Sequence, residues 1–168
     1  MTEKIELGRS ELRAVTAYAV ACAEPALPIF ERARPDDRRP HDAIEAARAF
    51  AEGAQRSKAI RDRAWAAQRA YQETRDAAQA AASEAARAAV AAAGAAFLHP
   101  LAKATQVWHI LGSAGHAAYA FELAGLAAPR PVADPVVVRV LSRYPMAPDG
   151  RGRVGELVRE LDALLRKG

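Results

Sequence analysis

Residues 57–96 constrain the fold more than any other part of the chain. Ala dominates this run, and Ala is the best helix former. Charged side chains fall between the small ones at helical spacing, which is typical of an amphipathic helix with a seam of small residues. We predict one ordered helix that begins after Ser57, or two helices in line with a break near Asp76. The predicted inner positions are Ile60, Ala64, Ala67, Tyr71, Thr74, Ala78, Ala81, Ala85, Ala88 and Ala92.

This seam also predicts how the helix packs. Small side chains let a neighbouring helix approach to the short end of the roughly 8–10 Å range of interaxial distances. The hydrophobic fraction is 51%, but much of it is Ala, so large apolar side chains are scarce. The core must therefore depend on close backbone approach as well as on bulk. At 168 residues the chain can bury about two-thirds of its unfolded surface in one domain.

Helical patterns fill most of the remaining sequence. Ser10 followed by Glu11 resembles an N-cap at the start of a helix. Gly112 and Gly115 interrupt a helical pattern, either as a bend or, as we prefer, where the Ala seam packs against bare backbone. Asp134 before Pro135 predicts another helix start. The helices expected besides 57–92 are residues 12–22, 27–34, 40–52, 101–109, 118–124, 136–143 and 154–165.

These patterns predict an all-α, single-domain bundle of about six to eight helices. The long Ala-rich helix is expected at its centre, flanked by the 40–52 and 101–124 helices. Three parts are expected along the chain. Residues 1–9 form a flexible arm, residues 10–125 a helical core, and residues 126–168 a linker plus two helices packed on the same domain. In the last helix the predicted inner positions are Val154, Leu157, Val158, Leu161, Leu164 and Leu165.

The charge pattern bounds the class of partner. The net charge is +4, but Lys and Arg are mixed with Asp and Glu along each segment, and only residues 34–39 and 151–153 form weak basic clusters. A nucleic-acid binder usually concentrates its charge on one face, so nucleic acid is an unlikely partner. The single Cys22 excludes an intrachain disulfide and is expected as a small buried side chain. Charges within the Ala-rich run and the absence of an apolar leader predict a cytoplasmic protein without a membrane span.

No motif for catalysis or cofactor binding stands out. His109 and His116 are seven residues apart, about 10.5 Å along a helix axis, which is too far for a shared metal. His41 and Glu45 have a spacing that one metal could bridge, but the other ligands of a zinc site are not supplied by any sequence motif. No nucleophile elbow and no phosphate-binding glycine loop occurs. We therefore expect a protein that is not an enzyme and has no metal or cofactor.

The densest run of signals is residues 35–50, in which two prolines bracket opposite charges and a helix follows. Two interpretations stay open. The charges can cap the helix and pair with one another, or they can form a rigid surface that recognises a partner. If a partner does not bind this run, the alternative contact surface is the 109–116 face, with His109 and His116, or the C-terminal helix. The candidate partner-binding residues are Asp36, Asp37, Arg38, Arg39, His41, Glu45, His109 and His116.

Several segments resemble a family of small, Ala-rich bacterial proteins labelled putative immunity proteins, which are associated with polymorphic toxin systems. The resemblance covers roughly residues 12–124 and leaves the tail from Leu126 outside it. It implies a protein that binds and blocks a toxin without catalysis. The segments that carry it are 22–24 (CAE), 27–31 (LPIFE), 35–40 (PDDRRP), 43–50 (AIEAARAF) and 112–120 (GSAGHAAYA).

The charge refines what this resemblance implies. A toxin that is a nuclease must itself be basic, so a basic inhibitor suits an acidic or apolar target surface better, unless the acidic cluster at 36–45 is the local contact. Two other readings remain alternatives: a helical scaffold or homo-oligomer of unknown role, and a weakly basic nucleic-acid-binding protein.

Overall fold

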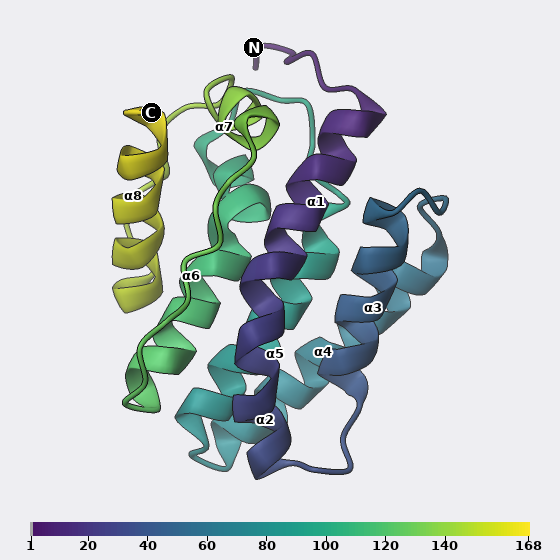
Figure 1. Ribbon diagram of the computed structural model, residues 1–168, viewed down its shortest axis with the longest axis vertical. Coiled ribbons are helices and arrows are strands. Elements are labelled where there is room, and N and C mark those ends of the chain that lie inside the picture. Colours follow the sequence, from purple (N-terminus) through teal and green to yellow (C-terminus); the bar gives the residue numbers. More distant parts are fainter. Residues whose placement is uncertain (1) are drawn as a thin grey trace.

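The computed structural model describes residues 2–168, and this part of the chain is a helical bundle without strands (Figure 1). The predicted all-α fold is confirmed. One isolated bridge, between Lys4 and Leu101, is the sole extended pairing in residues 2–168. The α-helices are α1 (Arg9–Ala23), α2 (Leu27–Ala33), α3 (Arg39–Ala51), α4 (Lys58–Asp76), α5 (Ala80–Ala95), α6 (Val107–Leu123), α7 (Pro135–Leu141) and α8 (Gly152–Arg166), with 3-10 turns at Glu24–Ala26 and Ala104–Gln106.

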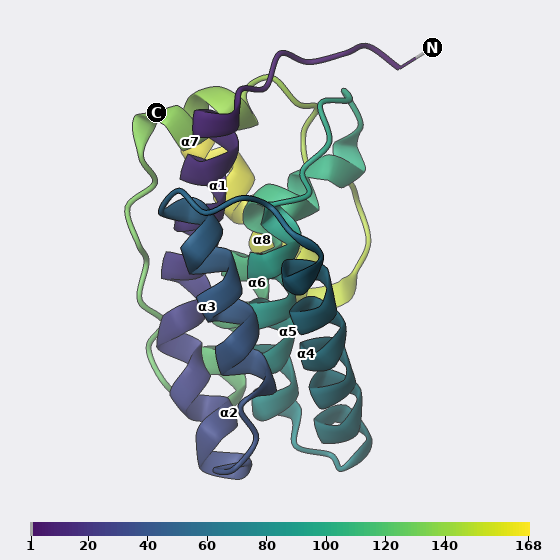
Figure 2. The same ribbon diagram turned by 90° about the vertical axis from the view of Figure 1, so that its right-hand side faces the viewer.

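Helix α5 lies at the centre of the bundle. Helices α1, α2, α3, α4 and α6 all contact it, so it is enclosed from several directions (Figures 1 and 2). Only a helix of small side chains can be approached this closely by so many neighbours, since larger ones would hold them apart. The Ala-rich sequence therefore determines which helix is central. Its buried positions are Ala82, Ser83, Ala85, Ala86, Ala88, Ala89, Ala92, Ala93 and Ala95.

The Ala-rich run breaks near Asp76, as predicted, but its two halves do not lie in line. Helices α4 and α5 fold back on each other as a hairpin and pack side by side (Figure 2). Ala78 takes the left-handed conformation with a φ of 60°, and the Gln79 N–H donates to Thr74 O at 2.9 Å. This is the geometry that usually ends a helix at Gly. Ala78 is exposed, so its predicted inner position was wrong.

Helix α6 differs from its predicted start. Residues 101–109 do not form one helix, because the chain pairs with Lys4 at Leu101 and turns into a helix only at Val107. From there α6 runs unbroken through Gly112 and Gly115, which confirms close packing and excludes a bend. The neighbours are not the predicted seam. A Cβ on Gly112 would lie 3.7 Å from Ala91 of α5, which the seam did not include, and a Cβ on Gly115 would lie 2.5 Å from Val158 of α8.

The N-terminal end of the chain is tied to the body of the fold. Helix α1 begins at Arg9, after Gly8 and not after Ser10, because the Gly8 N–H donates to the Glu11 carboxylate at 2.9 Å. The segment expected as an arm is extended, and the Ile5 N–H donates to Pro100 O at 2.8 Å.

Helix α8 packs on α6 with Val154 and Val158 inward, but Leu164 is 54% exposed, contrary to its predicted inner position. In its place the carboxylate of Asp162 is fully buried and accepts from Ala147 N and Arg166 Nε at 2.8 and 2.7 Å. A polar anchor therefore replaces part of the expected apolar stripe. None of the helices in residues 2–168 combines the length and the apolar character needed to cross a membrane.

Candidate functional site

The charged run at residues 34–45 forms the connection between α2 and the start of α3. Pro35 leads the chain out of α2, and the Asp37 N–H donates to Arg34 O at 3.2 Å to close a turn. Pro40 then occupies the first turn of α3, where a missing N–H costs nothing. The run is an open depression on the surface rather than an enclosed cavity.

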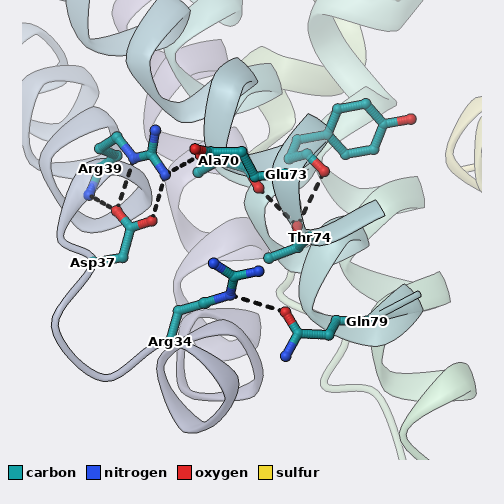
Figure 3. Close-up of polar contacts among 8 residues, drawn as sticks. Arg34, Asp37, Arg39, Ala70, Glu73, Thr74 and Gln79 are labelled. Atoms are coloured by element: carbon teal, nitrogen blue, oxygen red, sulfur yellow. Dashed lines mark hydrogen bonds and ion pairs between the residues drawn. The ribbon is translucent and has the colours of Figure 1, made fainter. Parts of the chain in front are cut away.

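The side chains of Asp37 and Arg39 are hydrogen-bonded to other groups of the protein (Figure 3). The Arg39 guanidinium donates to both carboxylate oxygens of Asp37, at 2.9 and 2.7 Å, and also pairs with Glu73 of α4. The Arg39 backbone N–H donates to the same carboxylate at 3.1 Å. These hydrogen bonds from Arg39 hold the pKa of Asp37 below its ordinary value. For this pair the structure agrees with the interpretation in which the charges pair with one another and hold the helix start, although the N-cap residue of α3 is Arg38, which makes no side-chain cap bond.

A second contact ties the connection to the α4–α5 turn. Arg34 Nε donates to the side-chain oxygen of Gln79 at 2.9 Å (Figure 3). Thr74, in the last turn of α4, turns its hydroxyl inward and donates to Ala70 O at 2.7 Å. The connection is therefore held at both ends, by Arg34 and by Arg39, against the same hairpin.

The remaining candidates on this connection face outward. Arg38 is exposed and its Nη2 lies 3.0 Å from Nδ1 of His41. Asp36 is exposed, His41 is partly exposed, and Glu45, one turn after His41 on α3, is exposed. We call Asp36, Arg38, His41 and Glu45 the α3 surface. Its side chains are not used to join α3 to another helix, whereas Arg39 is.

The histidines of α6 lie elsewhere, because α5 stands between α3 and α6 (Figure 1). His109 Nδ1 is 2.9 Å from Gly94 O, and His116 Nδ1 is 2.6 Å from the Glu84 carboxylate. Burial lowers the pKa of both histidines, so each is a neutral ring that donates its Nδ1–H. The eight candidates thus fall into three groups. Four form the α3 surface, Asp37 and Arg39 form an ion pair beside it, and His109 and His116 are partly buried on α6.

One contact near those histidines was missed by sequence analysis. The Arg151 guanidinium carbon is 4.2 Å from the ring centroid of Trp108 on α6. Arg87, on α5 one turn after Glu84, is partly buried, and burial lowers its pKa. The basic run 151–153 was a weak sequence signal for Arg151, but only the fold brings this residue onto Trp108.

A family model described as Imm-5 like putative immunity protein matches residues 6–97, which is more than half of the chain. The chain belongs to this Imm-5 like family. No curated protein and no solved structure matches it. The suspected family is therefore confirmed.

In this Imm-5 like protein the segment matched by the family model ends between α5 and α6. The matched segment contains α1 to α5, and with them the α3 surface and Arg87. Helices α6 to α8 lie outside it, with Trp108, the two histidines of α6 and Arg151. The resemblance seen in the sequence extended to about residue 124, which is further than the match.

A groove of about 510 Å³ lies between α1, α6, α8 and the linker of this Imm-5 like protein. Its lining is mostly apolar, and the Arg153–Glu122 ion pair, at 2.8 Å, stands at its edge. Cys22 lines it from α1, but burial raises the pKa of this thiol to about 12, so it is a thiol at neutral pH. The groove therefore has no activated nucleophile at Cys22.

The structure offers no evident metal centre either. Within residues 2–168 there is no group of three or more His, Cys, Asp or Glu side chains placed to hold a metal ion. His41 Nδ1 lies 3.4 Å from Asp42 and 3.0 Å from Arg38, a cation that disfavours a second positive charge.

Proposed function

We propose that this Imm-5 like protein binds and neutralises a cognate bacterial toxin, and that it does so through the α3 surface. The observation that carries the proposal is the family match, which includes all of α3 and the connection before it. An immunity protein acts by stable association, so it needs a well-ordered contact surface and no reactive group.

The contacts beneath the α3 surface support this choice. Arg39 joins the start of α3 to Glu73, and Arg34 joins the preceding turn to Gln79. A surface held in this way loses little conformational entropy when a partner binds. Arg38 and His41 contact each other and not a second helix, so a partner can bind them without breaking a contact between helices.

The charges on the α3 surface indicate a mixed interface. The exposed residues Asp36 and Arg38 precede α3 and the exposed Glu45 follows on it, so the α3 surface carries both signs of charge. Complementary pairs at an interface set specificity and the rate of encounter. We expect a target surface with an acidic group opposite Arg38 and a basic group opposite the carboxylates.

The test begins with the reading frame next to this gene. Its product, if it is a toxin, is expressed in a bacterial host with and without this protein, and growth is measured. We expect growth to be restored and the two proteins to co-purify. Growth arrest that persists despite soluble expression of both proteins would contradict the neutralising function.

The interface is tested in the same system. Arg38→Ala with His41→Ala should weaken binding at least about tenfold, mostly through faster dissociation. Exposed charges contribute little to folding, so the melting temperature should stay close to that of the unmodified protein. Arg69→Ala, which removes an exposed arginine of α4, is the matched control and should bind normally. Full binding by the Arg38 and His41 variant would move the interface away from the α3 surface.

A further inference from the structure

We propose that the groove between α1, α6, α8 and the linker is a binding site for a small amphiphile, an apolar chain that ends in a carboxylate. None of the four residues of the α3 surface lines this groove. The site therefore goes beyond the toxin proposal. Its test uses this protein alone, so either proposal can fail without the other.

The shape of the groove is the first reason. Helices α1, α6 and α8 and the linker that follows α6 all contribute lining residues, so the groove is bounded from several sides (Figure 1). Its volume of about 510 Å³ lies within the roughly 300–1,000 Å³ of small-molecule sites. A helix about 10 Å wide fills roughly 420 Å³ with each turn. The groove would hold little more than one turn of a partner helix, and it suits a small molecule better.

Uncovered leucines are the second reason. Leu164 of α8 and Leu126 of the linker are 54% and 47% exposed, and both line the groove. Leu157 and Leu161 of α8 line it as well and are only partly buried. Single exposed leucines need no explanation, but apolar side chains gathered in one concave site are typical of ligand-binding grooves. An apolar chain in the groove would remove their surface from water.

The charges of the lining residues favour an anionic head group. Arg153 is paired with Glu122 at 2.8 Å and with Glu156 at 3.1 Å, and Glu160 lies 3.9 Å from the same guanidinium. Arg130 of the linker is exposed, and among residues 2–168 its guanidinium makes no ion pair and no hydrogen bond. Arg130 is therefore the lining cation whose donors are available. A guanidinium fork can bind a carboxylate through two parallel hydrogen bonds.

The α1 side of the groove is neutral. Tyr18 and Cys22, one turn apart on α1, both line it, and burial raises the pKa of both side chains. Both are uncharged at neutral pH, so neither repels a carboxylate nor needs a counter-ion. The groove thus combines mostly apolar walls with one available cation, and a few polar groups in an apolar lining are what orients a ligand in such sites.

The experiment titrates the protein with decanoate, below the concentration at which micelles form, and follows the heat by isothermal titration calorimetry. Decan-1-ol has the same chain without a charge, and the decyltrimethylammonium ion has it with the opposite charge. We expect saturable binding of one decanoate per protein, with decanol at least about fivefold weaker and the cation weaker still. Failure of decanoate to saturate, or equal binding of all three chains, would overturn the proposal.

Three variants connect this binding to the groove. Leu164→Asp adds a negative charge to the α8 wall, and Ala118→Phe fills space beside α6. Each should weaken decanoate binding at least about tenfold. Leu164 is more than half exposed, so its variant is expected to fold even if Ala118→Phe does not. Arg130→Gln should weaken decanoate at least about fivefold and leave decanol binding unchanged, because it removes the partner of the carboxylate alone.

The matched control is Arg69→Gln, which removes an exposed arginine of α4 outside the groove and should bind decanoate normally. Melting temperatures without ligand show whether each variant folds, and decanoate should raise that of the unmodified protein. Decanoate binding that is indifferent to both Leu164→Asp and Arg130→Gln would place the ligand elsewhere and overturn the proposal.

Sedimentation identifies a different occupant of the groove. We expect the protein to sediment as a monomer with and without decanoate. A dimer that Leu164→Asp converts to a monomer would assign the groove to a second copy of the chain and overturn the small-ligand site. If decanoate did not bind and Leu164→Asp abolished binding of the toxin, the groove would instead belong to the interface with that protein.

Discussion

At the scale of single residues, two glycines of α6 illustrate how one packing contact decides the effect of a substitution. A Cβ added at Gly115 would lie 2.5 Å from Val158 Cγ2, closer than real contacts, whereas one added at Gly112 would find its nearest neighbours at 3.6 and 3.7 Å. Both positions are helical, so helix propensity alone would favour replacing either Gly. Only Gly115 is required for close packing with α8.

This difference gives a matched pair of variants. Gly115→Leu should overpack the α6–α8 contact and lower the free energy of unfolding by about 1–3 kcal/mol. Gly112→Ala should raise it by about 0.5–1 kcal/mol, because Ala loses less backbone entropy in a helix. Urea unfolding of both variants measures the difference. Equal effects of the two substitutions would contradict the packing of α8 on Gly115.

The buried histidines predict a pH dependence of stability. Burial lowers the pKa of His109, and neighbouring His99, Arg87 and Arg151 act in the same direction; burial also lowers that of His116 despite its bond to Glu84. The unfolded chain therefore takes up these protons at higher pH than the folded chain. Stability is fully present above the ordinary histidine value of about 6.5 and falls as the pH drops below it.

Each histidine contributes a slope of at most about 1.4 kcal/mol per pH unit. Chemical unfolding at pH 7.5, 6.5 and 5.5 measures this loss, which should shrink when His109 and His116 are both replaced by Gln. A free energy of unfolding that is constant across the range would show that neither ring is held neutral.

At the scale of elements, the hairpin between α4 and α5 depends on one left-handed residue. Ala78 has a φ of 60°, a conformation that costs an L-residue roughly 1–2 kcal/mol. Ala78→Gly should therefore raise the free energy of unfolding by about 1 kcal/mol. Ala77→Gly, one residue earlier with a φ of −85°, is the control and should lower it by up to about 1 kcal/mol. Thermal melting measures both effects. If the two variants behaved alike, the left-handed conformation of Ala78 would be wrong.

The start of α3 also depends on one acid of a neighbouring pair. Asp37 accepts from the Arg39 backbone and guanidinium, while Asp36 is exposed. Asp37→Ala should cost about 1–2 kcal/mol, as the loss of a cap does. Asp36→Ala should change stability by less than about 0.5 kcal/mol. The comparison is made by urea unfolding, and a larger effect at Asp36 would mean that the wrong acid has been identified as the cap.

At the scale of the whole molecule, the family-matched segment is only part of the packed unit. Helix α5 contacts α6 along its length, and α6 supplies Ile110 and Leu111, which are fully buried. A fragment of residues 1–97 would expose that side of α5. We expect it to aggregate or to melt without cooperativity in circular dichroism and size-exclusion experiments. A cooperative, monomeric fragment would show that α1 to α5 fold without α6.

The sequence alone determined the helical fold, the central place of the second half of the Ala-rich run, α5, and most helix ends. These depend on local properties: helical period, caps and the small volume of Ala. It also marked residues 35–50, because prolines and charges there are adjacent in the chain. The structure then distinguished Asp37, which is used for the fold, from Arg38, which is not.

Only the tertiary structure decided how distant segments meet. The reversal between α4 and α5 depends on the left-handed Ala78, and no Gly or Pro in the sequence indicates a turn there. Arg151, just before α8, lies over the Trp108 ring of α6, and the sequence holds no local signal for this contact. Local sequence sets the conformation of each helix, but burial and unpaired charge are properties of the packed chain, so they emerge only when the helices are placed together.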